Sequence, residues 1–371
     1  MAKFTEIFDD VTKLGRKIPT NEYLSEGKYP IVDQGQNMIA GYTDETDGLY
    51  EDVPAIIFGD HTRILKYVDT PCFLGADGVK LLKAKKENAN YKYLYYALCN
   101  VNIPNTGYNR HFKWLKESEF DIPSCEEQKR IVDVLDKVSE LIDLRKKQLS
   151  KLDELVKSRF VELFGDPFDA TRWMVKELKD VSESMIDGSN VNTDFYESQG
   201  DVLFLRIQNV WCNEFRLDDS VYITQEINNK HYYETSLKTG DLLITKIGRY
   251  YTKDSSLGRV SVYRGEDDCA NYSNNIMRVR LNDCVNSEFV NILLNLDDYQ
   301  RYIKRTSKGG TDKRALSKSL IGSYPIIIPP KTLQDEFVSL VKQIDKSKLE
   351  VKESLEKLET LKKALMQKYF G

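Results

Sequence analysis

An ungapped internal repeat constrains this 371-residue chain more than any other feature. The stretch Ile122–Gly165 reads a second time, with substitutions, as Ile328–Gly371, at a constant offset of 206 positions (328 − 122). Both copies are rich in Lys, Glu and Leu, which is typical of long solvated helices. The repeat therefore predicts two similar halves in tandem, each ending in the same long helix, an arrangement suited to gripping two similar objects at a fixed distance. The positions that anchor the repeat are Ile122-Pro123 and Ile328-Pro329, Gln128 and Gln334, Leu149 and Leu355, Leu152 and Leu358, and Phe164-Gly165 and Phe370-Gly371.

Within each copy, seam residues recur at alternating steps of four and three, the a/d pattern of a coiled coil. At about 1.5 Å per residue, a helix of about 40 residues spans on the order of 60 Å. Neither segment is apolar enough all round to be a core helix, so we expect the two helices to pack on each other. The seam of the first copy is Ile131, Leu135, Val138, Ile142, Arg145, Leu149, Leu152 and Val156, and that of the second is Phe337, Val341, Ile344, Lys348, Val351, Leu355, Leu358, Lys362 and Leu365.

The connection between the copies bears on the direction of the helices. Gly165 and Pro167 end the first helix, and the chain then builds a whole second globule before the second helix begins. A two-fold relation between the halves predicts antiparallel helices, with the globules at opposite ends. The alternative, a parallel pair, would place both globules at one end.

The regions before the two helices correspond more loosely than the helices do. Asn90–Leu98 and Asn286–Leu294 both read as short helices, preceded by β-like runs separated by Gly, Asn and Asp. The two long helices are thus similar in sequence, while the globular regions that precede them, here called the heads, differ. The β-like runs are Pro54–Phe58, Val79–Leu82, Leu203–Ile207, Asp241–Thr245, Arg259–Tyr263 and Ile276–Leu281.

The predicted fold class is α+β with a pseudo-two-fold internal repeat. Two mixed α/β domains, residues 1–121 and 166–327, are separated by two long antiparallel coiled-coil helices, residues 122–165 and 328–371.

Composition limits the class of protein. A net charge of −4 excludes a globally basic chain but leaves room for local basic faces. The six cysteines are dispersed, with no C-x-x-C pair, so we expect free thiols in a reducing cytoplasm and no metal site. No stretch approaches the roughly 18 apolar residues of a membrane span. We therefore expect a soluble cytoplasmic protein that does not engage a membrane.

Two basic, glycine-containing segments stand at equivalent places, each before a repeated Ile-Pro. Tyr299–Lys318 carries a single acid, Asp312, and we expect both segments to be loops that contact a DNA backbone. The alternative is a solvated, mobile loop without a partner. The candidate residues in the second half are Lys304, Arg305, Lys308, Gly309, Gly310, Thr311, Lys313 and Arg314, and those in the first half are Tyr108, Asn109, Arg110, His111 and Lys113.

Readers of base edges are expected to be Asn, Gln, Arg and Lys on rigid elements near those loops. Such residues are also common on any protein surface, so each one alone is weak evidence. The candidates are Gln34, Gln36, Asn37 and Arg63 in the first half and Lys246, Arg249, Asn274 and Asn275 in the second.

A search for catalytic motifs indicates a binding protein. The chain has no G-x-x-x-x-G-K-[ST] phosphate loop and no G-x-G-x-x-G after a predicted strand. Asp166-Pro167-Phe168 is close to the D-P-P-F of adenine methyltransferases but lacks the second proline, and it stands where a helix ends. His61, His111 and His231 have no evident acid or nucleophile partner in the sequence.

Together these patterns resemble the DNA-specificity subunit of type I restriction–modification enzymes. The resemblance covers essentially the whole chain, and its most specific part is the pair of Ile-Pro…Gln helix starts. The second copy departs from the family pattern at Lys331-Thr332-Leu333, which replaces the usual acidic residue before Gln334. The residues that carry the resemblance are Ile122–Val132 and Ile328–Gln334, Phe164–Pro167 followed by Trp173 and a strand-like Val175–Val181, Gly240–Gly248, and Gly75–Leu82 after Thr70-Pro71-Cys72.

The resemblance implies two target-recognition domains, each reading one half of a split, asymmetric site in double-stranded DNA, with the helices setting the unread spacer. It implies no catalytic activity and no cofactor bound by this chain. The partners would be two methyltransferase subunits that transfer methyl groups from S-adenosylmethionine to adenine N6. Two restriction–translocation subunits, using ATP with magnesium, could join them.

Two other classes stay open at the level of sequence. One is a coiled-coil adaptor with two protein-binding heads, against which the paired basic segments argue. The other is a nuclease or methyltransferase that acts alone, which turnover by the purified chain would reveal.

Overall fold

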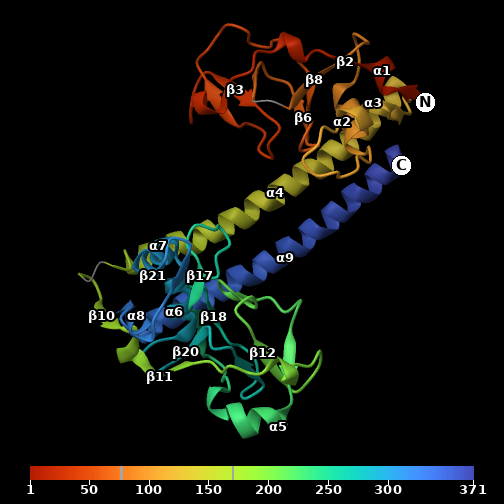
Figure 1. The fold of residues 1–371 in the computed structure, drawn as a ribbon. Coiled ribbons are helices and arrows are strands. Elements are labelled where there is room, and N and C mark those ends of the chain that lie inside the picture. The colour runs from red at the N-terminus through yellow and green to blue at the C-terminus, as the bar shows by residue number, and fades with distance from the viewer. Residues whose placement is uncertain (76–77, 169–170) are drawn as a thin grey trace. The chain divides into compact units, whose positions relative to one another are not determined.

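The structure, a computed structural model, describes residues 1–75, 78–168 and 171–371. It divides into two compact units: the first joins Met1–Gln148 to Val351–Gly371, and the second is Leu149–Glu350. Two long helices, α4 (Cys125–Phe164) and α9 (Lys331–Phe370), are each divided between the two units (Figure 1). Each unit therefore consists of a globular head with the first half of one long helix and the second half of the other. Ala76 and Asp77, in the stretch Gly75–Leu82 that carries part of the family resemblance, lie outside the described residues.

The ends of the long helices confirm the predicted repeat. Both α4 and α9 begin and end at positions 206 apart. The hydroxyl of Ser124 accepts a 3.3 Å hydrogen bond from the backbone N–H of Glu127, which caps the start of α4. At the other end Gly165 adopts a left-handed φ of 79° and donates to the carbonyl of Val161, as helix-terminating glycines do.

The repeated glutamine explains the Ile-Pro…Gln spacing. The amide Nε2 of Gln128 donates to the carbonyl of Pro123 at 2.9 Å, and Gln334 makes the same bond to Pro329 at 2.9 Å. Gln334 is fully buried and also accepts a 2.8 Å bond from the backbone N–H of Asn286. The departure at residues 331–333 therefore leaves the start of α9 unchanged, because the glutamine holds this turn.

The antiparallel pairing of α4 and α9 is confirmed within the second unit. Phe164, in the last turn of α4, packs against Phe337 near the start of α9, with ring centroids 5.3 Å apart. Asp153, eleven residues earlier, pairs with Lys348, eleven residues later, at 2.8 Å. In the first unit Lys146 pairs with Glu359 at 3.2 Å.

The seam differs from the expectation in one respect: the first turns of each long helix are core elements of a head. Ile131 and Leu135 are buried in the core of the first head, and Phe337 and Val341 in that of the second. Seam residues nearer the middle, such as Leu152, are only half-buried. The two helices therefore combine coiled-coil pairing with direct packing into the heads.

Among the described residues, the first head contains two sheets of three or more strands. One is antiparallel, and the other pairs β3 with β7 in parallel. In sheet order, the described strands are β2 (Phe8–Asp10), β8 (Val79–Ala84), β5 (Ala55–Gly59) and β6 (Leu65–Val68) in the first sheet, and β4 (Gly41–Thr43), β3 (Tyr29–Val32) and β7 (Phe73–Leu74) in the second. The remaining elements are α1 (Phe4–Ile7), α2 (Tyr91–Cys99), α3 (Phe112–Lys116) and the pair β1 (Ala2–Lys3) and β9 (Glu119–Phe120).

The second head repeats this order strand for strand. In the same sheet order, its described strands are β11 (Ser182–Asp187), β20 (Ile276–Leu281), β16 (Leu242–Thr245) and β18 (Val260–Val262), then β15 (Val221–Ile223), β12 (Val202–Leu205) and β19 (Ala270–Tyr272). β12 and β19 are again parallel. The counterparts of α2, β1 and β9 are α6 (Ser287–Asn295), β10 (Met174–Glu177) and β23 (Pro325–Ile328).

The heads therefore differ far less than their sequences suggest. The second head adds the pair β13 (Val210–Trp211) and β14 (Glu214–Phe215), the helices α5 (Gln225–Ile227) and α7 (Asp297–Thr306), and the strands β17 (Ile247–Arg249), β21 (Lys308–Gly309) and β22 (Lys313–Ala315). Its helix α8 (Lys318–Gly322) is the counterpart of α3, 206 positions later. The expected strand over Val175–Val181 ends at Glu177, because a 3₁₀ turn follows over Leu178–Val181.

An aromatic cluster joins the head to both long helices in the second unit. Phe160 and Phe164 of α4, Phe289 of α6 and Phe337 of α9 are each at most 1% exposed. Their neighbouring ring centroids lie 5.0 to 5.9 Å apart. In the first unit Tyr93 of α2 packs on the ring of Phe370 at 5.3 Å. The core of each head thus needs residues from both helices.

Across the described residues, no helix combines the length and the apolar character that crossing a membrane requires.

Replacing Gln334 with Leu should destabilise the second unit more than the same change at Gln128 destabilises the first. Gln334→Leu keeps the volume but leaves the buried carbonyl of Pro329 and the N–H of Asn286 without this partner, at about 1–3 kcal/mol for each unmet group. The side chain of Gln128, by contrast, satisfies one backbone group, the carbonyl of Pro123. Thermal unfolding measures this, at roughly 2–4 °C per kcal/mol. Equal shifts for the two variants would contradict the account of the repeated glutamine.

Candidate nucleic-acid interface

The candidate residues of the first unit lie on three connections. Gln34, Gln36 and Asn37 follow β3, Arg63 lies in the turn between β5 and β6, and the basic segment leads into α3. Gln36 and Asn37 are exposed, and Gln34 is half-buried. Two of these connections follow strands of different sheets and the third follows α2, so only the tertiary structure can bring their side chains together.

His61 joins these connections. Its backbone N–H donates to Oε1 of Gln34 at 3.2 Å, and its ring Nδ1 lies 3.2 Å from the carbonyl oxygen of Asn109. The ring of Tyr108 stacks on the imidazole with centroids 4.6 Å apart and planes within 6°. The structure thus brings together Gln34, Tyr108 and Asn109, and the residue that assembles them was not among the predicted DNA-binding residues.

Arg63 and Asn37 are both held by hydrogen bonds to residues distant in the sequence. Arg63 has a left-handed φ of 63°, and its guanidinium donates to the carbonyl of Ile103 at 3.2 Å. The carbonyl of Asn37 accepts from Nζ of Lys66, which is 4% exposed and also lies 3.3 Å from Asp33. Burial lowers the pKa of Lys66, and the neighbouring carboxylate of Asp33 acts in the opposite direction. The Asn37 connection therefore has a fixed base from which its exposed side chain projects.

His111 is a correction to the predicted interface. Its side chain is fully buried, and both its backbone N–H and its ring Nδ1 lie within 3.0 Å of the carbonyl oxygen of Asp60. The carboxylate of Asp60 accepts from the N–H of Phe112 at 2.7 Å, which completes the anchor. A side chain so placed cannot reach DNA. It holds the base of the segment, whereas Tyr108, Asn109, Arg110 and Lys113 are exposed.

The basic segment of the second unit is also corrected, because it is not a loop. Lys304 and Arg305 lie in the last turn of α7, where cations complement the carboxyl end of a helix. The chain then forms a hairpin of β21 (Lys308–Gly309) and β22 (Lys313–Ala315), and β22 also pairs with β17 (Ile247–Arg249). Lys308 and Lys313 are exposed on this hairpin.

The two glycines of the hairpin have different roles. Gly309 has φ 145°, and a Cβ atom there would stand 2.6 Å from the carbonyl oxygen of Lys313. A Cβ on Gly310 would meet nothing within 4 Å. Gly309 is therefore required for strand pairing, while Gly310 and Thr311 form the exposed tip that a phosphate could approach.

Several predicted cations of the second unit already have contacts within the protein. Nζ of Lys246 donates to Asp187 at 2.6 Å, and its side chain is 17% exposed. The guanidinium of Arg314 lies 3.9 Å from the centre of the Tyr250 ring, and that of Arg249 lies 3.6 Å from Asp312. We expect Lys246 and Arg314 to act mainly as supports of this surface.

The two asparagine candidates lie beside that surface. The carbonyl of Asn275 accepts from the backbone N–H of Lys246 at 2.8 Å, which ties the segment after β19 to the end of β16. Asn274 is exposed, and Asn275 is half-buried. The structure thus brings Lys246, Arg249, Asn275 and Arg314 onto one surface with the hairpin.

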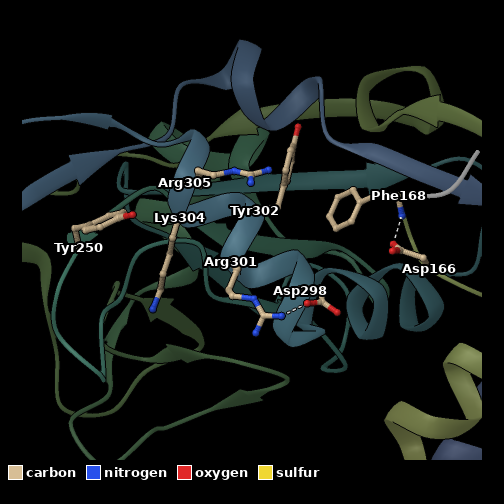
Figure 2. Close-up of a pocket in the computed structure, with 8 residues that line it drawn as sticks. All are labelled: Asp166, Phe168, Tyr250, Asp298, Arg301, Tyr302, Lys304 and Arg305. Carbon is tan, nitrogen blue, oxygen red and sulfur yellow. Dashed lines mark hydrogen bonds and ion pairs between the residues drawn. The ribbon is translucent and has the colours of Figure 1, made fainter.

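A cleft of 780 Å³ lies along α7 and is lined also by Tyr250, the residue whose N–H donates to Asp312 of the hairpin. Figure 2 shows Arg301, Tyr302, Lys304 and Arg305 projecting from α7, with Arg301 turned to Asp298 and the ring of Phe168 facing Tyr302. No carboxylate partner is recorded for Lys304 or Arg305 among the described residues. Cations beside aromatic rings suit a nucleic-acid backbone and its bases.

Within the described residues, no group of three or more His, Cys, Asp or Glu is placed to hold a metal ion.

Comparisons with known proteins agree with this geometry. The sequence profile of the family described as "Type I restriction modification DNA specificity domain" matches residues 3–154 and 171–362. A curated relative, the EcoR124I/EcoR124II specificity subunit of Escherichia coli, is 28% identical over 35% of this chain and 37% of its own length. The chain thus matches well under half of that relative.

Solved structures show the same fold. A crystal structure of the S subunit of a type I restriction–modification system from M. genitalium matches with a TM-score of 0.61 at 16% identity, covering 100% of this chain and 95% of that one. A chain from work on the "complex assembly" and "conformational transition" of the type I R-M system matches with a TM-score of 0.53, also at 16% identity and with the same coverage. The chain therefore belongs to the type I restriction–modification DNA specificity family, and the adaptor alternative is not favoured.

The hairpin glycines offer a matched pair of variants. Gly309→Ala should disrupt the β21–β22 pairing, because its Cβ would collide with the opposite strand. Gly310→Ala should leave the hairpin intact. Amide hydrogen exchange over residues 308–315 measures this: faster exchange is expected for Gly309→Ala alone. Similar exchange in both variants would mean that the cross-strand approach at Gly309 does not limit hairpin stability.

Proposed function

We propose that this chain is the DNA-specificity subunit of a type I restriction–modification complex and reads a bipartite, asymmetric site, one half with each head. The observation that carries the proposal is the match of the family profile to both halves of the chain. The repeated strand order supports it, because each head presents its connections from an equivalent framework.

The two kinds of predicted contact would have different tasks. Exposed cations such as Lys308 and Lys313 would bind phosphates and supply salt-dependent affinity. Side chains on the connections after β3 and β19, such as Gln36, Asn37 and Asn274, would contact base edges in the major groove. Because the whole chain carries a net charge of −4, we expect weak binding by the chain alone and stronger binding with its partners.

The partners we propose are two adenine methyltransferase subunits, with restriction–translocation subunits joining in a complete system in the cytoplasm. The chemistry would belong to those subunits: methyl transfer from S-adenosylmethionine, and restriction driven by ATP with magnesium. This chain would bind no cofactor and perform no catalysis itself.

Exposed leucines on the long helices support two equivalent docking sites. Leu155 on α4 is 48% exposed, and Leu361 on α9 is 46% exposed. They occupy equivalent positions of the repeat, one in each unit. An apolar side chain kept exposed in both copies fits burial against two copies of one partner.

Mapping modified adenines across the genome of cells that carry this chain with its methyltransferase tests the proposed function directly. A bipartite motif with two unrelated halves is the expected outcome. A continuous motif, or no motif that depends on this chain, would overturn the proposal.

The exposed hairpin lysines should contribute affinity without sequence preference. In Lys308→Ala combined with Lys313→Ala, binding to duplex DNA should weaken roughly equally for all sequences. The slope of log affinity against log salt should fall by about two, one for each lost phosphate contact. Fluorescence anisotropy of the complex at several salt concentrations measures both quantities.

The control for this double variant removes the same charge elsewhere in the second unit. Lys230→Ala combined with Lys238→Ala changes two exposed lysines outside the hairpin and the cleft. It should leave the salt slope unchanged. An equal loss in both double variants would indicate a general charge effect in place of contacts at the hairpin.

The docking sites should each be sensitive to one charged substitution. Leu155→Glu and Leu361→Glu should each reduce the methyltransferase that co-purifies with the chain by about half, and the double variant should abolish it. Leu217→Glu, at a head residue that is 46% exposed, is the control and should have no effect. Full co-purification with the double variant would place the docking surface elsewhere.

A further inference from the structure

Two tyrosines stand out because their rings are held in place but face solvent. Tyr108 is 86% exposed and Tyr251 is 74% exposed, the highest values for aromatic side chains among the described residues. Single exposed aromatic residues are common on protein surfaces. These two differ because each has a ring partner that orients it and is followed in the same connection by an exposed cation, Arg110 after Tyr108 and Lys253 after Tyr251.

In the first unit the partner of Tyr108 is His61. The two rings are nearly parallel, so one face of Tyr108 is covered and the other faces solvent. His61 is itself fixed by its contacts to Gln34 and Asn109, and a Cβ at Gly78 would lie 2.6 Å from the imidazole. Tyr108 thus rests on a rigid platform.

In the second unit the partner of Tyr251 is Tyr250. The two rings meet edge to face with centroids 4.9 Å apart. Tyr250 is tied to the hairpin because its N–H donates to the carbonyl of Asp312 at 2.8 Å and its ring carries the guanidinium of Arg314. The free ring of Tyr251 therefore stands beside the hairpin that carries Lys308 and Lys313.

The same two connections take part in both arrangements. One is the connection between β5 and β6, which corresponds to that between β16 and β18. The other is the segment between α2 and β9, which corresponds to that between α6 and β23. In the first unit the former supplies the platform, His61, and the latter the free tyrosine. In the second unit the former supplies both Tyr250 and Tyr251, and the latter supplies the hairpin that holds Tyr250. In both units the free tyrosine is therefore positioned where these two connections meet.

We propose that Tyr108 and Tyr251 each stack on a nucleobase of duplex DNA, unstacking one base step in each half-site. The inference rests on the proposed function and adds to it a way of reading DNA through its deformability. Stacking on a fixed aromatic face is favourable for any base, and the neighbouring cations would hold the adjacent phosphates. Because unstacking costs least at flexible pyrimidine–purine steps, each half-site should contain such a step at the contacted position.

The test uses the full chain with its methyltransferase and a duplex of about 40 base pairs that carries the mapped bipartite site. Tyr108→Ala and Tyr251→Ala should each weaken binding about tenfold or more, the loss expected for one stacked base. Tyr108→Phe and Tyr251→Phe should bind like the wild type, because the ring and not the hydroxyl makes the contact. Tyr233→Ala, at a tyrosine that is 56% exposed, is the control and should bind normally.

Direct contact is tested by replacing each thymine of the site in turn with 5-iodouracil and irradiating the complex. Stacking predicts crosslinks from Tyr108 in one half-site and from Tyr251 in the other, each lost in the matching alanine variant. Normal affinity of the alanine variants, or the absence of both crosslinks at every substituted position, would overturn the inference alone. A wild-type complex that fails to bind the duplex would overturn the proposed function and this inference with it.

Discussion

The packing of both long helices into both heads is the constraint on which the rest of the structure depends. In the second unit Phe160 and Phe164 at the end of α4 and Phe337 at the start of α9 are buried in one cluster with the head. In the first unit Phe370 packs on Tyr93 in the same way. Burying such rings contributes several kcal/mol each. The helices are therefore part of each head as well as the connection between the heads.

This packing leaves the connections of each head free to diverge. The strand order is the same in both heads, yet the first presents a His–Tyr stack where the second presents a basic hairpin. Binding residues generally lie on loops that a rigid framework positions. One framework used twice, with different connections, is a simple way to recognise an asymmetric target.

The sequence predicts the long helices well because their signal is local and repeated. A seam of period 3.5 over about 40 residues, present twice, leaves little choice of structure. The hairpin is not predicted because residues 308–315 lack alternating apolar residues, and its stability depends on pairing with β17, whose paired residues lie 64 to 68 positions earlier. The burial of His111 depends on Asp60, 51 positions away, so a window around His111 reads only a basic loop. The common strand order was hidden because equivalent strands share pattern but few identical residues.

Because the first unit is built from two separate stretches of the chain, it cannot complete its folding while the protein is still being synthesised. Its core needs residues from Val351 onward, which are made only after the whole second unit, about 200 residues later. At about 5–20 residues per second this delay is on the order of ten seconds or more. The second unit, continuous from Leu149 to Glu350, can close its core in the meantime. The half that is synthesised first is thus the half that completes its folding last, and its aromatic residues must stay protected from aggregation until the end of α9 arrives.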